Sequence, residues 1–168
     1  MSVGMNGGMS VGRLVGIARR EQRRAPMQEI AEGVISVEAG LAGDSKGAKF
    51  PLRQITVLAR EAWAAAAAEV GDPILSWTVR RANLLVEGVE LPRARGGIFS
   101  VGAVRLEVTG RTYPCIRMEE ARAGLLKALA ADWRGGVTCR VLSGGPIGLG
   151  DGIGVLVRPP EVVPRLPG

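Results

Sequence analysis

The chain has 168 residues, of which 46% are hydrophobic and 4% aromatic, and it carries a formal net charge of +6. This length favours one domain with a core of Val, Leu, Ile and Ala. The sequence has no histidine and only two cysteines, which excludes His-based and all-cysteine zinc sites, His-activated nucleophiles and a disulfide framework.

The N-terminal segment contains a glycine-rich start and a first strand. Residues 1–10 predict a disordered start that lacks the charged and apolar regions of a secretory signal. Residues 11–18 predict a strand, and the basic segment 19–24 predicts an exposed loop. No apolar run approaches the roughly 18 residues of a membrane span. We therefore expect a cytoplasmic protein with reduced thiols and no membrane contact.

The positive charge leaves nucleic acid, a membrane surface and an anionic small molecule open as ligands. Glu21 interrupts the densest basic run, and aromatic side chains are too few for a single-strand stacking platform. We therefore expect solvated basic faces together with an anion pocket, and nucleic acid is the less favoured ligand. A soluble basic protein without such a pocket is the alternative.

A glycine-rich turn follows a short predicted strand at 34–38. In residues 40–47, Asp44 follows one glycine and Lys46 precedes another, and such glycine-rich stretches are a strong turn signal. This turn either brings Asp44 and Lys46 toward a pocket or is an ordinary surface turn.

The middle of the chain alternates strands with one clear helix. The predicted elements are a strand at 53–58, a helix at 60–70, a strand at 84–86 and a hairpin of 98–101 with 104–108. Arg80, Arg81 and Asn83 precede the strand at 84–86. They either offer donors to a phosphate or carboxylate, or are solvated strand-end residues.

The C-terminal third predicts a helix from about residue 117 to 133, then strands at 137–142 and 153–157. Cys139 shares the face of Val137 and Val141 and is assigned to the core, whereas Arg140 points the other way. Residues 159–168 predict a proline-rich tail. Strands outnumber helices, so we expect a mostly β (α+β) fold over residues 11–158, a closed or nearly closed β-barrel with peripheral helices.

The other cysteine, Cys115, lies in the stretch 109–117, between the strand that ends near Val108 and the predicted helix. Arg111 and Arg117 flank Cys115, and a helix N-terminus with nearby cations favours the thiolate, which attacks electrophiles and binds metals. A plain buried cysteine is the alternative.

Several short motifs occur in a fixed order along the chain. They are Gly40-Leu41-Ala42-Gly43-Asp44, Arg53-Gln54-Ile55-Thr56, Arg80-Arg81-Ala82-Asn83-Leu84, Thr109 to Cys115, Gly135 to Leu142, Ser143-Gly144-Gly145 and Gly150-Asp151. In this order, and with the loop cysteine in place, the chain resembles the MOSC domain, the C-terminal domain of molybdenum cofactor sulfurases. The resemblance covers about residues 11–157, implies a β-barrel, and suggests a stand-alone member of the family.

The resemblance also implies a site for the molybdenum cofactor, a pterin with a dithiolene and a phosphate. Cys115 matches the loop cysteine that would ligate molybdenum or carry sulfur. The candidate cofactor-binding residues are Arg53, Arg80, Arg81, Asn83 and Arg140, with Arg111, Arg117, Asp44 and Lys46 near them. A family-level description also includes pyridoxal phosphate binding. Lys46 occupies the place where the family usually has histidine, and lysine would not move protons near neutral pH without a large pKa shift.

Three functions follow as hypotheses. In the first, Cys115 binds the cofactor or carries sulfur for delivery to, or maturation of, a molybdoenzyme, with that enzyme or a cofactor-biosynthesis protein as partner. In the second, the protein is a molybdenum-dependent reductase of N-hydroxylated compounds that uses an external electron donor. In the third, it is a non-enzymatic basic binding module.

Overall fold

The structure is a computed structural model that describes residues 11–160. The start at 1–10 and residues 161–168 of the proline-rich tail lie outside the described residues. The strands are β2 (Gly12–Arg19), β3 (Gln28–Ile30), β4 (Glu32–Ser36), β5 (Gly40–Leu41), β6 (Ile55–Ala59), β7 (Leu84–Glu87), β8 (Ile98–Val101), β9 (Val104–Arg111), β10 (Val137–Ser143), β11 (Gly145–Gly148) and β12 (Gly152–Val157). The helices are α1 (Arg60–Glu69), α2 (Ile116–Ala121) and α3 (Leu125–Ala130), with short 3-10 helices η1 (Trp77–Arg80) and η2 (Ala131–Trp133).

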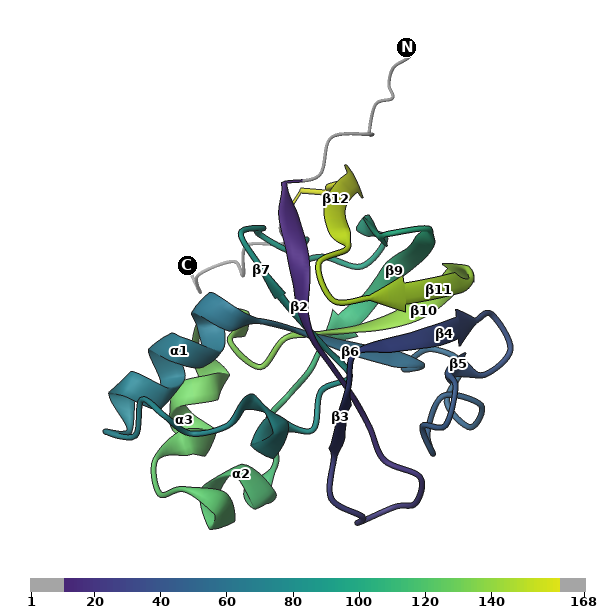
Figure 1. The fold of residues 1–168 in the computed structure, drawn as a ribbon. Helices are drawn as coiled ribbons and strands as arrows, with labels where there is room; N and C mark the ends of the chain where they lie inside the picture. The colour runs from purple at the N-terminus through teal and green to yellow at the C-terminus, as the bar shows by residue number, and fades with distance from the viewer. Residues whose placement is uncertain (1–10, 161–168) are drawn as a thin grey trace, which may run out of the picture.

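Seven strands form a closed ring in the order β12-β8-β9-β10-β6-β7-β2, because the start of β2 also pairs with β12. All these pairings are antiparallel except that of β6 with β7. The predicted closed barrel is therefore confirmed (Figure 1). Strand β3 extends β2 at the edge, and β11, β4 and β5 form a separate small sheet.

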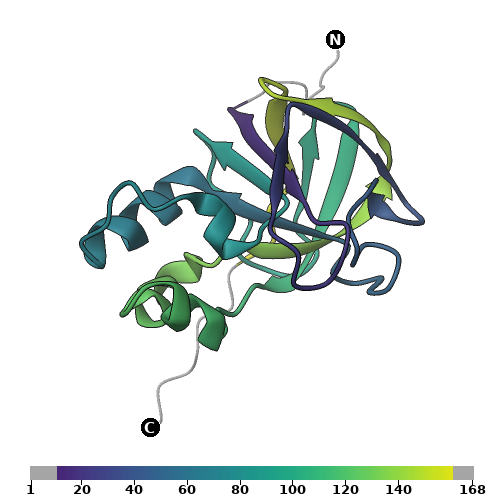
Figure 2. The same ribbon diagram turned by 60° about the horizontal axis from the view of Figure 1, so that its bottom comes forward.

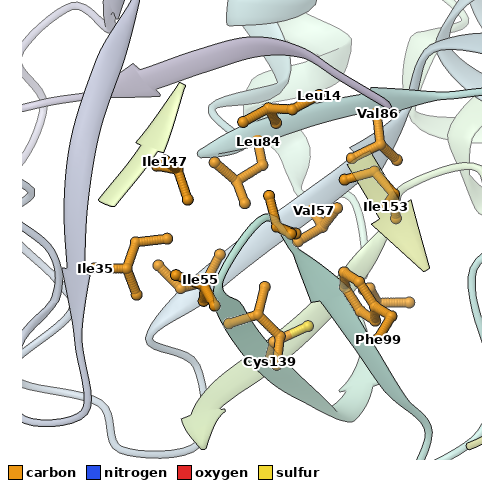
Figure 3. Packing of buried hydrophobic residues seen from close by; sticks show 14 of the residues in the cluster. Leu14, Ile35, Ile55, Val57, Leu84, Val86, Phe99, Cys139, Ile147 and Ile153 are labelled. Carbon is orange, nitrogen blue, oxygen red and sulfur yellow. The ribbon is translucent and has the colours of Figure 1, made fainter. Parts of the chain in front are cut away.

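The barrel interior is filled by aliphatic side chains from alternate positions of the ring strands. Leu14, Val57, Leu84 and Phe99 are fully buried there, and Figure 3 shows them pointing toward one another. Cys139 belongs to this cluster and has no exposed surface, which confirms its assignment to the core.

The helices gather on one side of the barrel, where α1 and α3 lie side by side (Figures 1 and 2). A second apolar cluster fills the space between them and the barrel, and it contains Leu58, Trp63, Met118 and Leu129. None of the helices in the described part of the chain is long and apolar enough to cross a membrane.

The expected single helix at 117–133 is wrong, because the structure divides it into α2, α3 and η2. Arg122 is extended, with φ −156° and ψ 124°, and Gly124 has φ 89°. The Glu119 carboxylate accepts hydrogen bonds from the backbone N–H groups of Gly124, at 2.9 Å, and Leu126, at 3.3 Å. This local capping satisfies donors at the start of α3 and stabilises the break.

Candidate functional site

The loop that carries Cys115 joins the end of β9 to the start of α2. Cys115 occupies the N-cap position of α2 with extended backbone, φ −112° and ψ 173°, and its thiol is exposed. The predicted junction between strand and helix is therefore confirmed. The Cys115 carbonyl accepts a hydrogen bond from the Met118 N–H at 2.9 Å, so the loop turns directly into the helix.

A cavity of about 350 Å³ opens beside this thiol and is called here the cysteine cavity. Its lining contains many cations and no carboxylate. The cations are Arg20, Arg23, Lys46, Arg53, Arg80, Arg81 and Arg117, and the other lining residues are Phe50, Thr56, Thr112, Cys115, Met118 and Thr138. Such a lining attracts an anion, because arginine forks match phosphate and carboxylate groups.

Arg80 fixes the cysteine loop to the barrel. Its side chain is buried, and its guanidinium donates from Nε to the Gly135 carbonyl at 3.1 Å and from Nη2 to the Thr112 carbonyl at 3.2 Å. A Cβ at Gly135 would lie 2.4 Å from the Thr112 oxygen, so only glycine allows this close approach. Burial lowers the pKa of Arg80, and the charge of Cys115 opposes that effect.

Arg81 connects the cavity to the basic loop after β2. Its guanidinium Nη2 donates to the Ala25 carbonyl at 2.8 Å. Its backbone is left-handed, with φ 66° and ψ 30°, a conformation that costs free energy in a residue with a side chain. Burial, then the charges of Arg20 and Arg117, lower the pKa of Arg81.

Lys46 brings a titratable amine to the cavity. Its ammonium donates a hydrogen bond to the Thr56 hydroxyl. Burial lowers the pKa of Lys46 from 10.5 to about 8, with Asp44 opposing and nearby arginines assisting. This is the large shift that a lysine needs to exchange protons near neutral pH. Asp44 anchors the turn because its Oδ1 accepts from the Arg20 N–H at 3.1 Å.

The structure brings six of the predicted site residues to the lining of the cysteine cavity and leaves four elsewhere. Those in the lining are Lys46, Arg53, Arg80, Arg81, Cys115 and Arg117. Those outside it are Asp44, Asn83, Arg111 and Arg140.

Two of the four have clear structural partners. Asn83 is fully buried, where its Oδ1 accepts from the Thr56 N–H at 3.0 Å and its Nδ2 donates to the Ala18 carbonyl at 3.3 Å. Arg140 forms an ion pair with Glu107 across β9 and β10, with an exposed side chain.

Arg111 is not in the lining of the cysteine cavity. Its guanidinium donates to the Ala130 carbonyl at 2.8 Å and lies 4.7 Å from the ring centre of Tyr113 and 5.6 Å from that of Trp133. It lines a second cavity of about 950 Å³, which shares Arg53, Thr112 and Thr138 with the cysteine cavity.

Sequence reasoning missed several lining residues. Arg20 and Arg23 lie in the expected loop, where Arg23 is exposed, and both also line the cysteine cavity. Phe50 was also missed; the guanidinium of Arg53 lies 5.1 Å from its ring centre.

The donor set of the cysteine cavity fits an anionic ligand that carries a soft metal. Cys115 supplies a thiol, and its thiolate form is a soft ligand that prefers soft metal centres. The Thr112 hydroxyl and the Nε of Arg81 are buried and have no hydrogen-bond partner among residues 11–160, and both residues line the cavity. Within the same residues, no cluster of three or more His, Cys, Asp or Glu side chains occurs.

Comparisons with known proteins agree with this architecture. The sequence model of the MOSC domain matches residues 44–154. The YuaD protein of Bacillus subtilis superposes with a TM-score of 0.71 at 19% identity, over 88% of this chain and 97% of that one. YiiM of Geobacillus stearothermophilus gives 0.69 at 17% identity, over 88% and 76% of the two chains. YiiM of Escherichia coli gives 0.63 at 18%, over 89% and 72%. No curated protein sequence matches the chain.

Proposed function

Because the chain belongs to the MOSC domain family, whose members are linked to the molybdenum cofactor, we propose that the cysteine cavity binds this cofactor or carries its sulfur. The protein would then deliver its cargo to a molybdoenzyme or receive it from a cofactor-biosynthesis protein. The observation that carries the proposal is an exposed thiol in a cavity lined by seven cations and no carboxylate. When bound, the cofactor supplies a sulfur-ligated metal and a phosphate.

Each group of residues has a distinct role in this proposal. Cys115 provides the thiolate that ligates the metal, or that accepts sulfane sulfur from the persulfide of a donor protein, which is left as a thiolate. The exposed arginines Arg53 and Arg117 bind and orient the phosphate. Arg80 is a positioning residue, because its donors are already engaged with the backbone of the cysteine loop.

Metal and pterin analysis tests the proposal. The protein is purified from cells that make the cofactor, and molybdenum and oxidised pterin are quantified for wild type and Cys115→Ala. We expect wild type to retain both and Cys115→Ala to lose most of the molybdenum. Arg140→Ala is the matched control, because Arg140 lies outside the cavity lining. Equal and negligible retention by wild type and Cys115→Ala would sink the proposal.

The sulfur-carrier form has its own readout. Intact-mass analysis of freshly isolated protein would detect the mass of one added sulfur on Cys115, and cyanide would remove it as thiocyanate. Retention of cofactor without such a modification favours cofactor carriage over sulfur transfer.

A reductase of N-hydroxylated compounds is the second candidate, and Lys46 is the observation that favours it. Converting such a compound to the amine uses two electrons and two protons and releases water, and the external donor supplies the electrons. With a pKa of about 8, the Lys46 ammonium can release a proton within the cavity. Cofactor-loaded protein should turn over N-hydroxylated substrates with a reduced donor, and Lys46→Met should lower kcat. Absence of turnover in a loaded sample would reject this candidate.

A further inference from the structure

The second cavity, of about 950 Å³, adjoins the cysteine cavity and is called here the adjoining cavity. Arg53, Thr112 and Thr138 line both, so the two cavities share a wall. The proposed cofactor site does not use the rest of the adjoining cavity. Its size falls within the range of ordinary ligand sites.

Two of the six aromatic side chains of the protein line the adjoining cavity. The chain has one tyrosine and three tryptophans, and Tyr113 and Trp133 both line it. The guanidinium of Arg111 contacts both rings, at 4.7 and 5.6 Å from their centres. Tyr113 is 72% exposed, so it offers further aromatic surface to a flat ring. Such surfaces stack nucleobases without requiring a particular base.

The charge of the adjoining cavity is positive. Arg53, Arg93, Arg95 and Arg111 line it, and Asp132 is the one acid in its lining. The Nε of Arg111 is buried and has no hydrogen-bond partner within residues 11–160. The arginine guanidinium groups can bind a phosphate, and the Asp132 carboxylate can accept hydrogen bonds from hydroxyl or amino groups of a ligand.

Backbone strain occurs at the same place. Asp132 and Trp133 are consecutive and both left-handed, with φ 49° and 57°. Residues other than glycine adopt this conformation at a cost, and such strain clusters at ligand sites. The strained pair directs one acidic and one aromatic residue to the cavity lining.

We propose that the adjoining cavity is a nucleotide site. The base stacks on Tyr113 and the Arg111 guanidinium, and the phosphate binds Arg93 and Arg95, which the cofactor site does not use. The nucleotide is either free or the nucleotide arm of a longer ligand whose other end occupies the cysteine cavity. The stacking surface argues against inorganic phosphate alone, because arginines by themselves would suffice for that ion.

Titration of the full chain with AMP, GMP, CMP and UMP tests this site without any metal. Calorimetry and tryptophan fluorescence report binding, and adenosine, guanosine and inorganic phosphate are the matched probes. We expect at least one nucleotide to bind about tenfold tighter than its nucleoside and than phosphate. Failure of all four nucleotides to bind at millimolar concentration would overturn the proposal, and it would leave the cofactor proposal unaffected.

Substitutions then locate the binding. We expect Tyr113→Ala and Arg95→Ala, both at exposed residues, to weaken nucleotide binding about tenfold or more. Arg105→Ala is the control. Arg105 is also exposed and lies on β9, and its substitution removes the same charge at a position outside the cavity lining. Loss of binding in Arg117→Ala but not in Tyr113→Ala would place the phosphate in the cysteine cavity and overturn the proposal.

Two further measurements identify the source of the nucleotide. Protein from cofactor-producing cells is hydrolysed in mild acid, and released nucleotide is compared with molybdenum. Equimolar amounts support a nucleotide arm, whereas nucleotide without molybdenum supports a free nucleotide. A single-stranded oligonucleotide that binds much more tightly than any mononucleotide, with a steep salt dependence, would contradict a mononucleotide site.

Discussion

The amine of Lys46 should make the stability of this protein depend on pH in a defined direction. The pKa of Lys46 falls from 10.5 to about 8 in the folded protein, chiefly through burial. Between these values the unfolded chain binds more protons, so the free energy of unfolding rises with pH. Below pH 8 the folded state carries the whole cost of this partly buried charge, which is at most about 3.4 kcal/mol.

Replacing Lys46 with methionine removes this cost together with one hydrogen bond to Thr56, which contributes about 1 kcal/mol. We therefore expect Lys46→Met to be about 2 kcal/mol more stable than wild type at pH 7, or about 4–8 °C in Tm. The advantage should shrink as the pH rises through 8. Near pH 10.5 the variant should be slightly less stable than wild type, because only the lost hydrogen bond remains.

Urea unfolding at one-unit steps from pH 6 to pH 10 measures the difference between the two proteins. Taking the difference in the free energy of unfolding between the two proteins cancels the contributions of other groups that titrate in this range. Lys49→Met is the control, since Lys49 is exposed and lies three residues along the same loop. A variant that is destabilised at every pH, or a difference that does not change with pH, would refute the reasoning.

Deprotonation of Lys46 should also weaken the binding of anions to the cysteine cavity. Sulfate keeps its charge over this range, so its affinity for the cysteine cavity should fall between pH 7 and pH 9 in wild type as the Lys46 ammonium deprotonates. In Lys46→Met the affinity should be lower at pH 7 and change less. Equal pH dependence in both proteins would exclude Lys46 as an anion contact.

Three more changes test other parts of the site. A thiol reagent such as DTNB should modify Cys115 in the native protein but Cys139 only after unfolding, because burial raises the pKa of the Cys139 thiol and excludes the reagent. Arg80→Met should lower the free energy of unfolding by about 2–3 kcal/mol in urea, since one buried and one partly buried carbonyl lose their donor, whereas exposed Arg117→Met should stay within about 0.5 kcal/mol. Gly136→Ala should lose about 2 kcal/mol or more by thermal unfolding, because its φ is 94° and a Cβ would lie 2.3 Å from a backbone oxygen.

The barrel was predictable because its strands carry a local signal. In β9, Val104, Leu106 and Val108 are buried and Arg105 is exposed, as the alternation of apolar and polar residues indicates. Closure of the ring has no such signal. It depends on Gly12 and its neighbour pairing with the start of β12, far along the chain.

The break between α2 and α3 was missed for a different reason. The apolar stripe continues across it, with Met118, Leu125 and Leu129 all buried in one cluster. Periodicity therefore indicated one helix, while the Glu119 carboxylate and Gly124 provide an end and a new start. Side-chain capping competes locally with helix continuation and leaves the hydrophobic pattern unchanged.

The site was only partly predictable, because motif position says which residues are near one another but not which way they point. Asn83 follows Arg81 closely in sequence, yet it is buried between β2 and β6 while Arg81 lines the cysteine cavity. Arg20 and Arg23 reach the same cavity from a loop that has no motif. Their arrival depends on how the loop after β2 folds back, where Arg81 binds the Ala25 carbonyl.

The distribution of charge favours a small anionic ligand over a polyanion. The net charge of +6 suggested a basic protein in general. Seven cations line the cysteine cavity, and without them the chain has 15 Lys and Arg against 16 Asp and Glu. These seven cations gather around one hollow rather than along a face, as backbone contacts to nucleic acid would require. A cavity of about 350 Å³ beside a thiol accommodates a small phosphorylated molecule and concentrates the field of those cations on it.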